Sequence, residues 1–341
     1  MALSSTRPII GITMGDPLGI GPEILIKALD NPDIYSICRP IVLGDAGVLS
    51  RAVTLVGTSI ELNPVPLPKN GLYSYKTIDF LKVSDLQPDG SRLSRPTPET
   101  GAAMEKYILT GIDLAMTNQI NGLVTCPITK TAMKLAGSKF HGHTELLAHH
   151  TQTRNYAMML SGDTLKVILS TIHIPLSQVP DQLSVQNILQ TIELTHTGLK
   201  DRFDIKSPRI GVAGLNPHAG EEQMFGPEET AVISPAVSLA KDKGINATGP
   251  LPPDTVFYQA ANQRFDAVVC MYHDQGLIPF KLIHFKDGVN TTLGLPIIRT
   301  SVDHGTAYDI AWQGIADSLS LEQAIKMAAF QAVNTQRNHP L

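Results

Sequence analysis

Short apolar runs alternate with helix-like segments along most of this chain. Runs such as 122–126, 165–171 and 266–272 lack the polar alternation of a half-exposed strand, so they predict strands buried on both faces. Between them, apolar residues recur every three to four positions, as in the helix expected to begin at Thr97. This alternation predicts a largely parallel α/β sheet with helices on both faces. Further strands are expected at 8–14, 40–44, 156–161 and 209–214, and further helices near Pro22 and at 184–199, 228–242 and 320–335.

Composition narrows the class of protein. A chain of 341 residues, 43% hydrophobic and 17% charged, is typical of a soluble globular protein large enough for two subdomains. A net charge of −4 without a long basic run argues against nucleic-acid or membrane-surface binding. The three dispersed cysteines indicate a reduced compartment without disulfides. No apolar run has membrane-spanning length or resembles a signal peptide, so we expect a cytoplasmic protein.

Three histidines each follow an apolar run: His173, His218 and His273. Ligands of parallel α/β proteins bind at the carboxyl ends of strands, so three imidazoles at that edge could hold a divalent metal and leave positions open for a substrate. Taken alone, each histidine is more often a polar strand end with an ordinary hydrogen bond. Their separations match no local metal motif, so both interpretations stay open.

A glycine-rich turn follows the first expected strand, at Gly15–Glu23. Its glycines stand at 15, 19 and 21, which is not the dinucleotide-binding spacing. One interpretation is a tight connection between a strand and a helix. The other is a close approach of the backbone to an anionic ligand at a helix N-terminus, which Asp16 and Glu23 make less favourable.

Several motifs resemble known families. GDPLGIGPE (15–23) and DHGTAYDIAWQGIAD (303–317) are similar to segments of the isocitrate and isopropylmalate dehydrogenase superfamily. The chain more closely resembles the 4-hydroxythreonine-4-phosphate dehydrogenase family of vitamin B6 biosynthesis, from about residue 8 to 335. The motifs that carry this resemblance are GHTE (142–145), GLNPHAGE (214–221), MYHDQGLIPFK (271–281), GVNTTLGLP (288–296) and IRTSVDHGTA (298–307).

The resemblance implies a fold and an assembly. It implies two α/β/α subdomains with largely parallel sheets and an active site in the cleft between them. The first would comprise 1–130 plus 290–341, on the nucleotide side, and the second 131–289, with the metal histidines and the dimer interface. The family also implies a homodimer whose active sites lie at the subunit interface.

The resemblance further implies the roles of individual residues. The metal ligands would be His173, His218 and His273, for one divalent cation (zinc, magnesium, cobalt or manganese) per site. Substrate contacts fall on His143, Thr144, Lys281, Asn290 and Arg299. The contacts to NAD or NADP are expected at His304, Gly305, Thr306, Ala307 and Asp309.

Three positions depart from the family pattern. His141 stands before GHTE where a smaller or cyclic residue is expected, and Thr291 replaces an aliphatic residue. Trp312 replaces the usual glycine and is expected to reshape the cofactor pocket.

The implied reaction needs these residue types. Hydride transfer from a secondary alcohol requires an alkoxide-like donor, and a divalent metal lowers the alcohol's pKa. The substrate carries a phosphate and a carboxylate, which Arg299 can hold with a planar pair of donors and Lys281 with a point charge. Catalytic roles are expected for Asp274, Asp254 and Lys281; each aspartate either takes a proton or orients its neighbours.

The family therefore implies that 4-(phosphooxy)-L-threonine and NAD give 3-amino-2-oxopropyl phosphate, carbon dioxide and NADH. Oxidation at C3 makes a β-keto acid, which loses carbon dioxide readily when its carbonyl is polarised. An alternative substrate is 4-phospho-D-threonate or 4-phospho-D-erythronate, which carries a hydroxyl in place of the amino group. A metal-dependent phosphatase or hydrolase is the alternative from another class, although no second carboxylate cluster for a two-metal site is evident.

Overall fold

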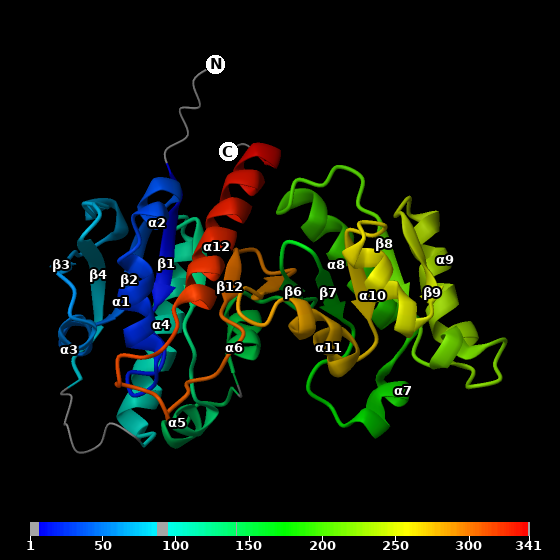
Figure 1. Ribbon diagram of the computed structural model, residues 1–341, viewed down its shortest axis with the longest axis horizontal. Coiled ribbons are helices and arrows are strands. Elements are labelled where there is room, and N and C mark those ends of the chain that lie inside the picture. The colour runs from blue at the N-terminus through cyan, green and yellow to red at the C-terminus, as the bar shows by residue number, and fades with distance from the viewer. Residues whose placement is uncertain (1–6, 87–94, 141, 340–341) are drawn as a thin grey trace. The chain divides into compact units, whose positions relative to one another are not determined.

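The computed structural model describes residues 7–86, 95–140 and 142–339 (Figure 1). The chain divides into two compact units. Unit 1 comprises Met1–Arg154 and Leu295–Val333, and unit 2 comprises Asn155–Gly294 and Asn334–Leu341. In these described ranges no helix combines the length and the hydropathy needed to span a membrane.

The sheet of unit 1 is parallel throughout, with the strand order β3-β4-β2-β1-β5-β12. Its strands are β1 (Ile9–Thr13), β2 (Arg39–Asp45), β3 (Glu61–Pro64), β4 (Thr77–Ser84), β5 (Gly122–Thr125) and β12 (Arg299–Ser301). Because the strands are parallel, their carboxyl ends share one edge, where β1 and β5 end in Thr13 and Thr125 and β12 ends in Ser301.

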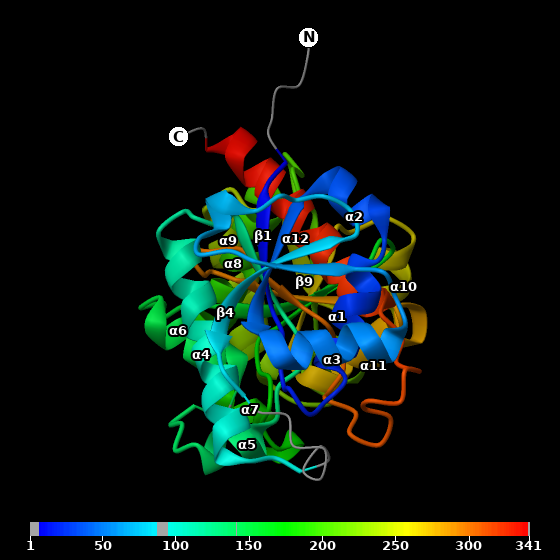
Figure 2. The ribbon, with the colours of Figure 1, turned by 90° about the vertical axis from the view of Figure 1, so that its left-hand side faces the viewer.

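Helices cover both faces of this sheet. Leu123 of β5 packs on Gly111 of the helix α4, whereas the preceding Gly122 faces Ala328 of α12. Consecutive strand residues point to opposite faces, so α4 and α12 lie on opposite sides. Figure 2 shows α4 on one side of the strands and α1 and α3 on the other. The helices of unit 1 are α1 (Gly21–Leu29), α2 (Pro32–Ile37), α3 (Ala46–Val56), α4 (Pro98–Met116), α5 (Lys130–Leu135), α6 (His143–His150) and α12 (Leu319–Asn338).

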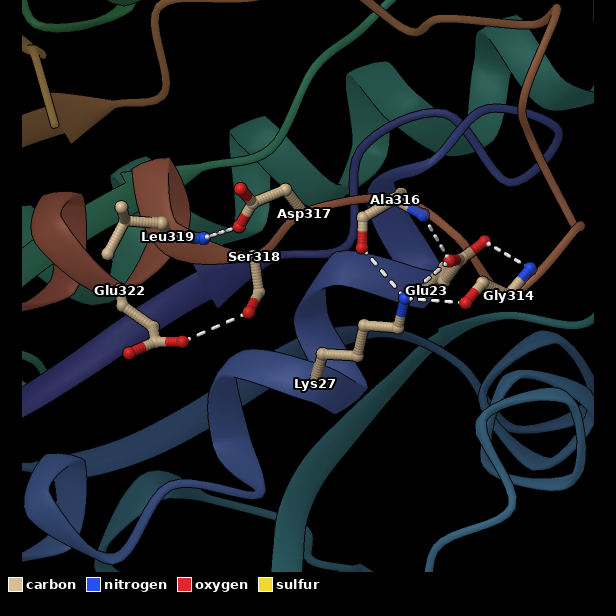
Figure 3. A network of polar contacts seen from close by, with 8 residues as sticks. All are labelled: Glu23, Lys27, Gly314, Ala316, Asp317, Ser318, Leu319 and Glu322. Atoms are coloured by element: carbon tan, nitrogen blue, oxygen red, sulfur yellow. Dashed lines mark hydrogen bonds and ion pairs between the residues drawn. The ribbon is translucent and has the colours of Figure 1, made fainter. Parts of the chain in front are cut away.

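A buried carboxylate joins the two chain segments of unit 1 (Figure 3). Glu23 on α1 is 1% exposed and accepts hydrogen bonds from the backbone N–H groups of Ala316 (2.7 Å) and Gly314 (3.2 Å). Lys27, one turn later, donates to Glu23 (2.9 Å) and to the carbonyl oxygens of Gly314 (2.8 Å) and Ala316 (2.7 Å). Glu23 and Lys27 together thereby satisfy the backbone N–H and C=O groups of both Gly314 and Ala316, close to the start of α12.

The glycine-rich turn is a tight connection. The N–H groups of Leu18, Gly19 and Ile20 donate to the Asp16 carboxylate, the Asp16 carbonyl and the Thr306 carbonyl, at 2.9–3.1 Å. A Cβ at Gly19 would lie 2.9 Å from the Thr306 carbonyl oxygen, so the glycine permits a close approach of the two segments. Since these amides donate within the protein, the first of the two interpretations of this turn is confirmed.

Unit 2 has a mixed sheet with the order β11-β6-β7-β10-β8-β9. The strand β6 runs antiparallel to both β11 and β7, while β7, β10, β8 and β9 run parallel to one another. These strands are β6 (Ala157–Ser161), β7 (Lys166–Leu169), β8 (Ile210–Ala213), β9 (Ala247–Leu251), β10 (Ala267–Cys270) and β11 (Val289–Leu293).

Figure 1 shows α10 and α11 in front of the strands of unit 2 and α8 behind them. The front layer buries a core that includes Val167, Val268 and Phe280. Gly276 permits α11 to pack closely, since an added Cβ would lie 3.0 Å from Cys270 Sγ and Leu169 Cδ2. The helices of unit 2 are α7 (Val179–Gln182), α8 (Val185–Asp201), α9 (Ser234–Asp242), α10 (Pro253–Ala261) and α11 (His273–Ile283).

The α/β class and every expected strand are confirmed, and Thr97 caps α4 by accepting a hydrogen bond from the Thr100 N–H at 3.2 Å. The expected boundary at residue 130 differs from the observed division after Arg154. The reason is that α5 and α6 pack on α4: a Cβ at Gly101 of α4 would lie 2.0 Å from the Ala132 carbonyl oxygen of α5.

We predict that Glu23→Ala lowers the free energy of unfolding by about 3 kcal/mol, because it leaves two backbone N–H groups and the Lys27 ammonium without their acceptor. Urea unfolding followed by the fluorescence of Trp312, the single tryptophan of the chain, measures this loss in the same segment. Glu61→Ala removes an exposed carboxylate from β3 and serves as the control. Equal losses in the two variants would contradict the assigned role of Glu23.

Candidate functional site

In unit 2, three adjacent parallel strands deliver the three candidate metal histidines to one edge. The strands β7, β10 and β8 are neighbours, and His173, His273 and His218 lie in the segments that follow them. His273 is the first residue of α11, directly after the turn that ends β10. The common edge therefore follows from the strand order, as the apolar runs predict.

Two of these histidines lie side by side. The ring centroids of His173 and His273 are 5.6 Å apart. The Nδ1 atom of His273 lies 2.6 Å from an oxygen of Asp274, which fixes the ring and leaves Nε2 as the nitrogen that can bind a metal. Two neighbouring imidazoles, one oriented by a carboxylate, fit a divalent cation by the chemistry of their donors.

His218 does not join this pair within one chain. It is exposed, and its ring centroid is 6.2 Å from that of Phe225 in the same loop. Among the residues that the structure describes, no group of three or more His, Cys, Asp or Glu side chains could hold a metal ion. The expected three-histidine cluster is thus incomplete within the described part of a single chain, where the loop after β8 holds His218 in a left-handed conformation with a φ of 52°.

In unit 1, the carboxyl ends of β1, β5 and β12 form a buried polar row. Arg299 is the first residue of β12 and is 2% exposed, and its side chain reaches the carboxyl end of β5, where it donates to the Thr125 hydroxyl at 2.8 Å. Burial lowers the pKa of Arg299 to about 10, so it remains a cation at neutral pH. Thr13 pairs in register with Thr125 and so shares its face of the sheet, and the Thr13 hydroxyl is buried without a hydrogen-bond partner among the residues described.

His143 and Thr144 begin α6 in the same unit. Although His143 is only partly buried as a residue, its Nε2 atom is buried and has no hydrogen-bond partner in the part of the chain that the structure describes. Burial, with a smaller contribution from the Arg299 charge, holds the pKa of His143 well below its usual range. The ring is therefore neutral at physiological pH, with a polar nitrogen available to a ligand. His141, one of the three departures from the family pattern, lies outside the described residues.

Unit 2 carries the other expected substrate and proton-transfer residues. Within the described ranges, Asn290 on β11 has a buried Oδ1 atom without a hydrogen-bond partner, and its neighbour Thr291 is fully buried. Lys281 lies partly buried in the last turn of α11. Asp254 is exposed in the first turn of α10, and its catalytic role stays a prediction.

The expected cofactor segment lies against the glycine-rich turn of unit 1. His304 and Gly305 are exposed, and a Cβ at Gly305 would meet open space, so a ligand can reach this backbone. Behind them, the Thr306 carbonyl accepts the Ile20 N–H at 3.0 Å, and the Tyr308 hydroxyl hydrogen-bonds to Asp16. The remaining expected contacts, Ala307 and Asp309, are partly buried and exposed, respectively.

Trp312 occupies a left-handed position, with a φ of 61°, a conformation that favours glycine. Its indole N–H donates to the Pro17 carbonyl at 3.2 Å, and Arg51 lies 4.5 Å from the ring centroid. Trp312 thus adds an aromatic contact between its own segment, 303–317, and the glycine-rich turn at Gly15–Glu23.

Sequence reasoning missed Thr13 and Thr125, although both end an apolar run, which is the signal that identified the histidines. It also missed Tyr308 and Asp16, whose contact depends on two segments that are distant in sequence. Burial raises the pKa of Asp16 despite that hydrogen bond.

Comparison with known proteins gives matches over nearly the whole chain. The family model described as "Pyridoxal phosphate biosynthetic protein PdxA" matches residues 36–328. The chain is 60% identical to the 4-hydroxythreonine-4-phosphate dehydrogenase of Desulforapulum autotrophicum, over 98% of this chain and 99% of the relative. It is 44% identical to the D-threonate 4-phosphate dehydrogenase of Cupriavidus necator, over 96% and 98%. It also matches the crystal structure of the 4-hydroxythreonine-4-phosphate dehydrogenase from Klebsiella pneumoniae, with a TM-score of 0.89 and 44% identity over 96% and 99%.

We predict that His143→Gln reduces the acid sensitivity of folding. The folded state holds the ring neutral, whereas the unfolded chain takes up a proton below about pH 6.5, so the wild type loses stability as the pH falls through that value. The variant lacks this titration. Its free energy of unfolding should therefore change less than that of the wild type between about pH 7.5 and about pH 5. His150→Gln changes an exposed ring on the same helix and should retain the wild-type dependence of unfolding free energy on pH. A wild-type dependence in His143→Gln would contradict the assignment of a neutral, buried ring to His143.

Proposed function

The chain belongs to the PdxA family of pyridoxal phosphate biosynthetic proteins, and we propose on that basis that it oxidises 4-(phosphooxy)-L-threonine at C3 with NAD or NADP. The β-keto acid then loses carbon dioxide to give 3-amino-2-oxopropyl phosphate. One observation above all supports a ligand at the family's substrate positions. His143 Nε2 and Asn290 Oδ1 are buried polar atoms without a partner among the described residues, and such atoms are rare unless a ligand or water satisfies them.

The substrate anions suit the charges of the proposed site. Arg299 is a buried guanidinium that presents paired donors, which match a phosphate or a carboxylate. Its bond to Thr125 fixes the side chain, so little conformational entropy is lost when an anion binds. Lys281 supplies a second cation for the other end of the substrate, and the neutral His143 ring adds a hydrogen bond without repelling Arg299.

His173, His273 and His218 are the proposed metal ligands. A bound divalent cation would supply the polarisation that lowers the pKa of the alcohol and favours loss of carbon dioxide. Asp274 holds the His273 ring through Nδ1, so its part is to orient a ligand. Asp274, Lys281 and Asp254 remain the candidates for accepting the hydroxyl proton, and Asp274 is the one that contacts a proposed ligand.

The segment from His304 to Asp309 is the proposed contact to the nicotinamide nucleotide, which would accept the hydride. The glycine-rich turn would support this segment, since the Ile20 amide donates to Thr306, while the amides of Leu18 and Gly19 donate to Asp16 within the turn. Tyr308 and Trp312 would fix the segment before the nucleotide binds, which reduces the entropic cost of binding.

The proposed active form is a homodimer. The side chains of Ile278 and Leu282 on α11 are 68% and 86% exposed, and Phe285, just after the helix, is 80% exposed. Large apolar side chains that gather on one surface are typical of a protein interface. This surface begins within five residues of His273, so a second copy bound there could present its own His218 to the His173–His273 pair.

The second candidate substrate is D-threonate 4-phosphate, because a relative that is 44% identical carries that name. The two substrates differ in one group, an amino group in place of a hydroxyl. Steady-state kinetics on both therefore test the assignment.

We predict a higher kcat/KM for 4-(phosphooxy)-L-threonine than for D-threonate 4-phosphate, measured as NADH or NADPH absorbance. Arg299→Lys keeps the charge but loses the planar pair of donors. The variant should therefore bind the phosphorylated substrate more weakly by about 1–3 kcal/mol, which is measured as a higher KM for that substrate. The KM for the nucleotide should hardly change and is the internal control. A preference for D-threonate 4-phosphate would establish the alternative, and release of free phosphate without reduced nucleotide would indicate a phosphatase.

A further inference from the structure

The His218 loop rests on a buried carboxylate that the reaction does not itself require. Glu229 is 3% exposed. Its Oε1 atom accepts hydrogen bonds from the backbone N–H groups of Leu215 and Asn216, both at 2.8 Å, and its Oε2 atom accepts one from the Asn216 side chain at 3.0 Å. The carboxylate therefore binds the beginning of the loop, two residues before His218.

The loop backbone needs such support. His218, Ala219, Glu221, Glu222 and Gln223 all have φ between 41° and 74°, and Gly220 has a φ of 84°. A run of left-handed residues that are not glycine is unfavourable, at about 1 kcal/mol or more each. Such a conformation persists only when surrounding interactions determine it, and Glu229 supplies three of them.

The loop also fits closely around this carboxylate. A Cβ at Gly220 would lie 2.6 Å from Glu229 Oε2, and one at Gly214 would lie 3.1 Å from Oε1. The two glycines of the segment Gly214–Gly220 thus stand where the backbone turns over the carboxylate. Glu229 itself begins a π-helical turn (Glu229–Ile233), a local irregularity that is frequent at functional sites.

A second buried side chain connects the loop to the His273 segment. Gln275 is 7% exposed and donates to the Gly214 carbonyl at 2.7 Å. Its Oε1 atom accepts the Met271 N–H, also at 2.7 Å, two residues before His273. The start of the His218 loop is therefore fixed to the strand end that carries another proposed ligand.

From these contacts we propose that Glu229 is a positioning residue for His218. Its carboxylate holds the loop in the one conformation that presents the His218 ring for metal binding. The inference rests on the proposed function, since it takes His218 as a metal ligand. An apolar or amide side chain of the same size cannot replace the carboxylate, because three N–H donors point at its two oxygens.

The test compares Glu229→Gln with the matched control Glu228→Gln. Glutamine keeps the shape of Glu229 but turns one acceptor into a donor that faces N–H groups. The neighbouring Glu228 accepts a hydrogen bond from the Asn216 side chain at 2.8 Å, so its substitution leaves the backbone bonds of Glu229 intact. Metal-free full-length protein is titrated with Co²⁺ by calorimetry. We expect the Kd to rise about tenfold or more in Glu229→Gln and less than about twofold in Glu228→Gln.

A second readout does not depend on the metal. In metal-free protein labelled with ¹³C-histidine, the ring signal of His218, assigned with His218→Gln, should be single in the wild type. It should broaden or shift in Glu229→Gln and stay unchanged in Glu228→Gln. If the wild type binds no Co²⁺, the metal assignment fails while the ring signal still decides whether Glu229 positions His218.

Should Glu229→Gln fail to fold, Gly220→Ala disturbs the same contact from the loop side and is expected to weaken Co²⁺ binding in the same way. Wild-type Co²⁺ affinity together with a wild-type His218 signal in a folded Glu229→Gln or Gly220→Ala variant would overturn the proposal.

Discussion

The contact between Glu23 and the segment that precedes α12 determines the architecture of unit 1. Glu23 belongs to the first helix, and its backbone partners Gly314 and Ala316 lie some 290 residues later. This buried acceptor, with Lys27, fixes the returning chain against α1. The position of the segment that carries the expected cofactor contacts depends on it, because Thr306 and Tyr308 contact the turn that leads into the same helix.

In unit 2, a buried carboxylate likewise binds backbone N–H groups at the edge of the sheet. Glu229, like Glu23, is a buried carboxylate whose partners are backbone N–H groups of a segment with little regular structure. A carboxylate can satisfy several such groups at once, which a loop without a ladder of its own requires. Each unit thereby places candidate functional residues on irregular backbone and keeps that backbone fixed.

The sequence predicted the features that depend on local pattern. Each expected apolar run became a strand, and the histidines after three of them reached one edge. The strands β11 and β12 were missed because they are not apolar runs: they carry Asn290 and Arg299, whose polar groups belong to the candidate site. The orientation of His218 could not be predicted either, since it depends on a left-handed backbone that Glu229 stabilises from 11 residues away.

The central claim is that one chain supplies His173 and His273 while its partner supplies His218. Dehydrogenase activity of mixed dimers tests this most directly. Exchange of subunits between His173→Ala and His218→Ala should restore about a quarter of wild-type activity, because half of the dimers are mixed and each of those has one intact site. Exchange between His173→Ala and His273→Ala should restore none, since each site then lacks one of the paired rings. Recovery in the second mixture, or its absence in the first, would contradict the account.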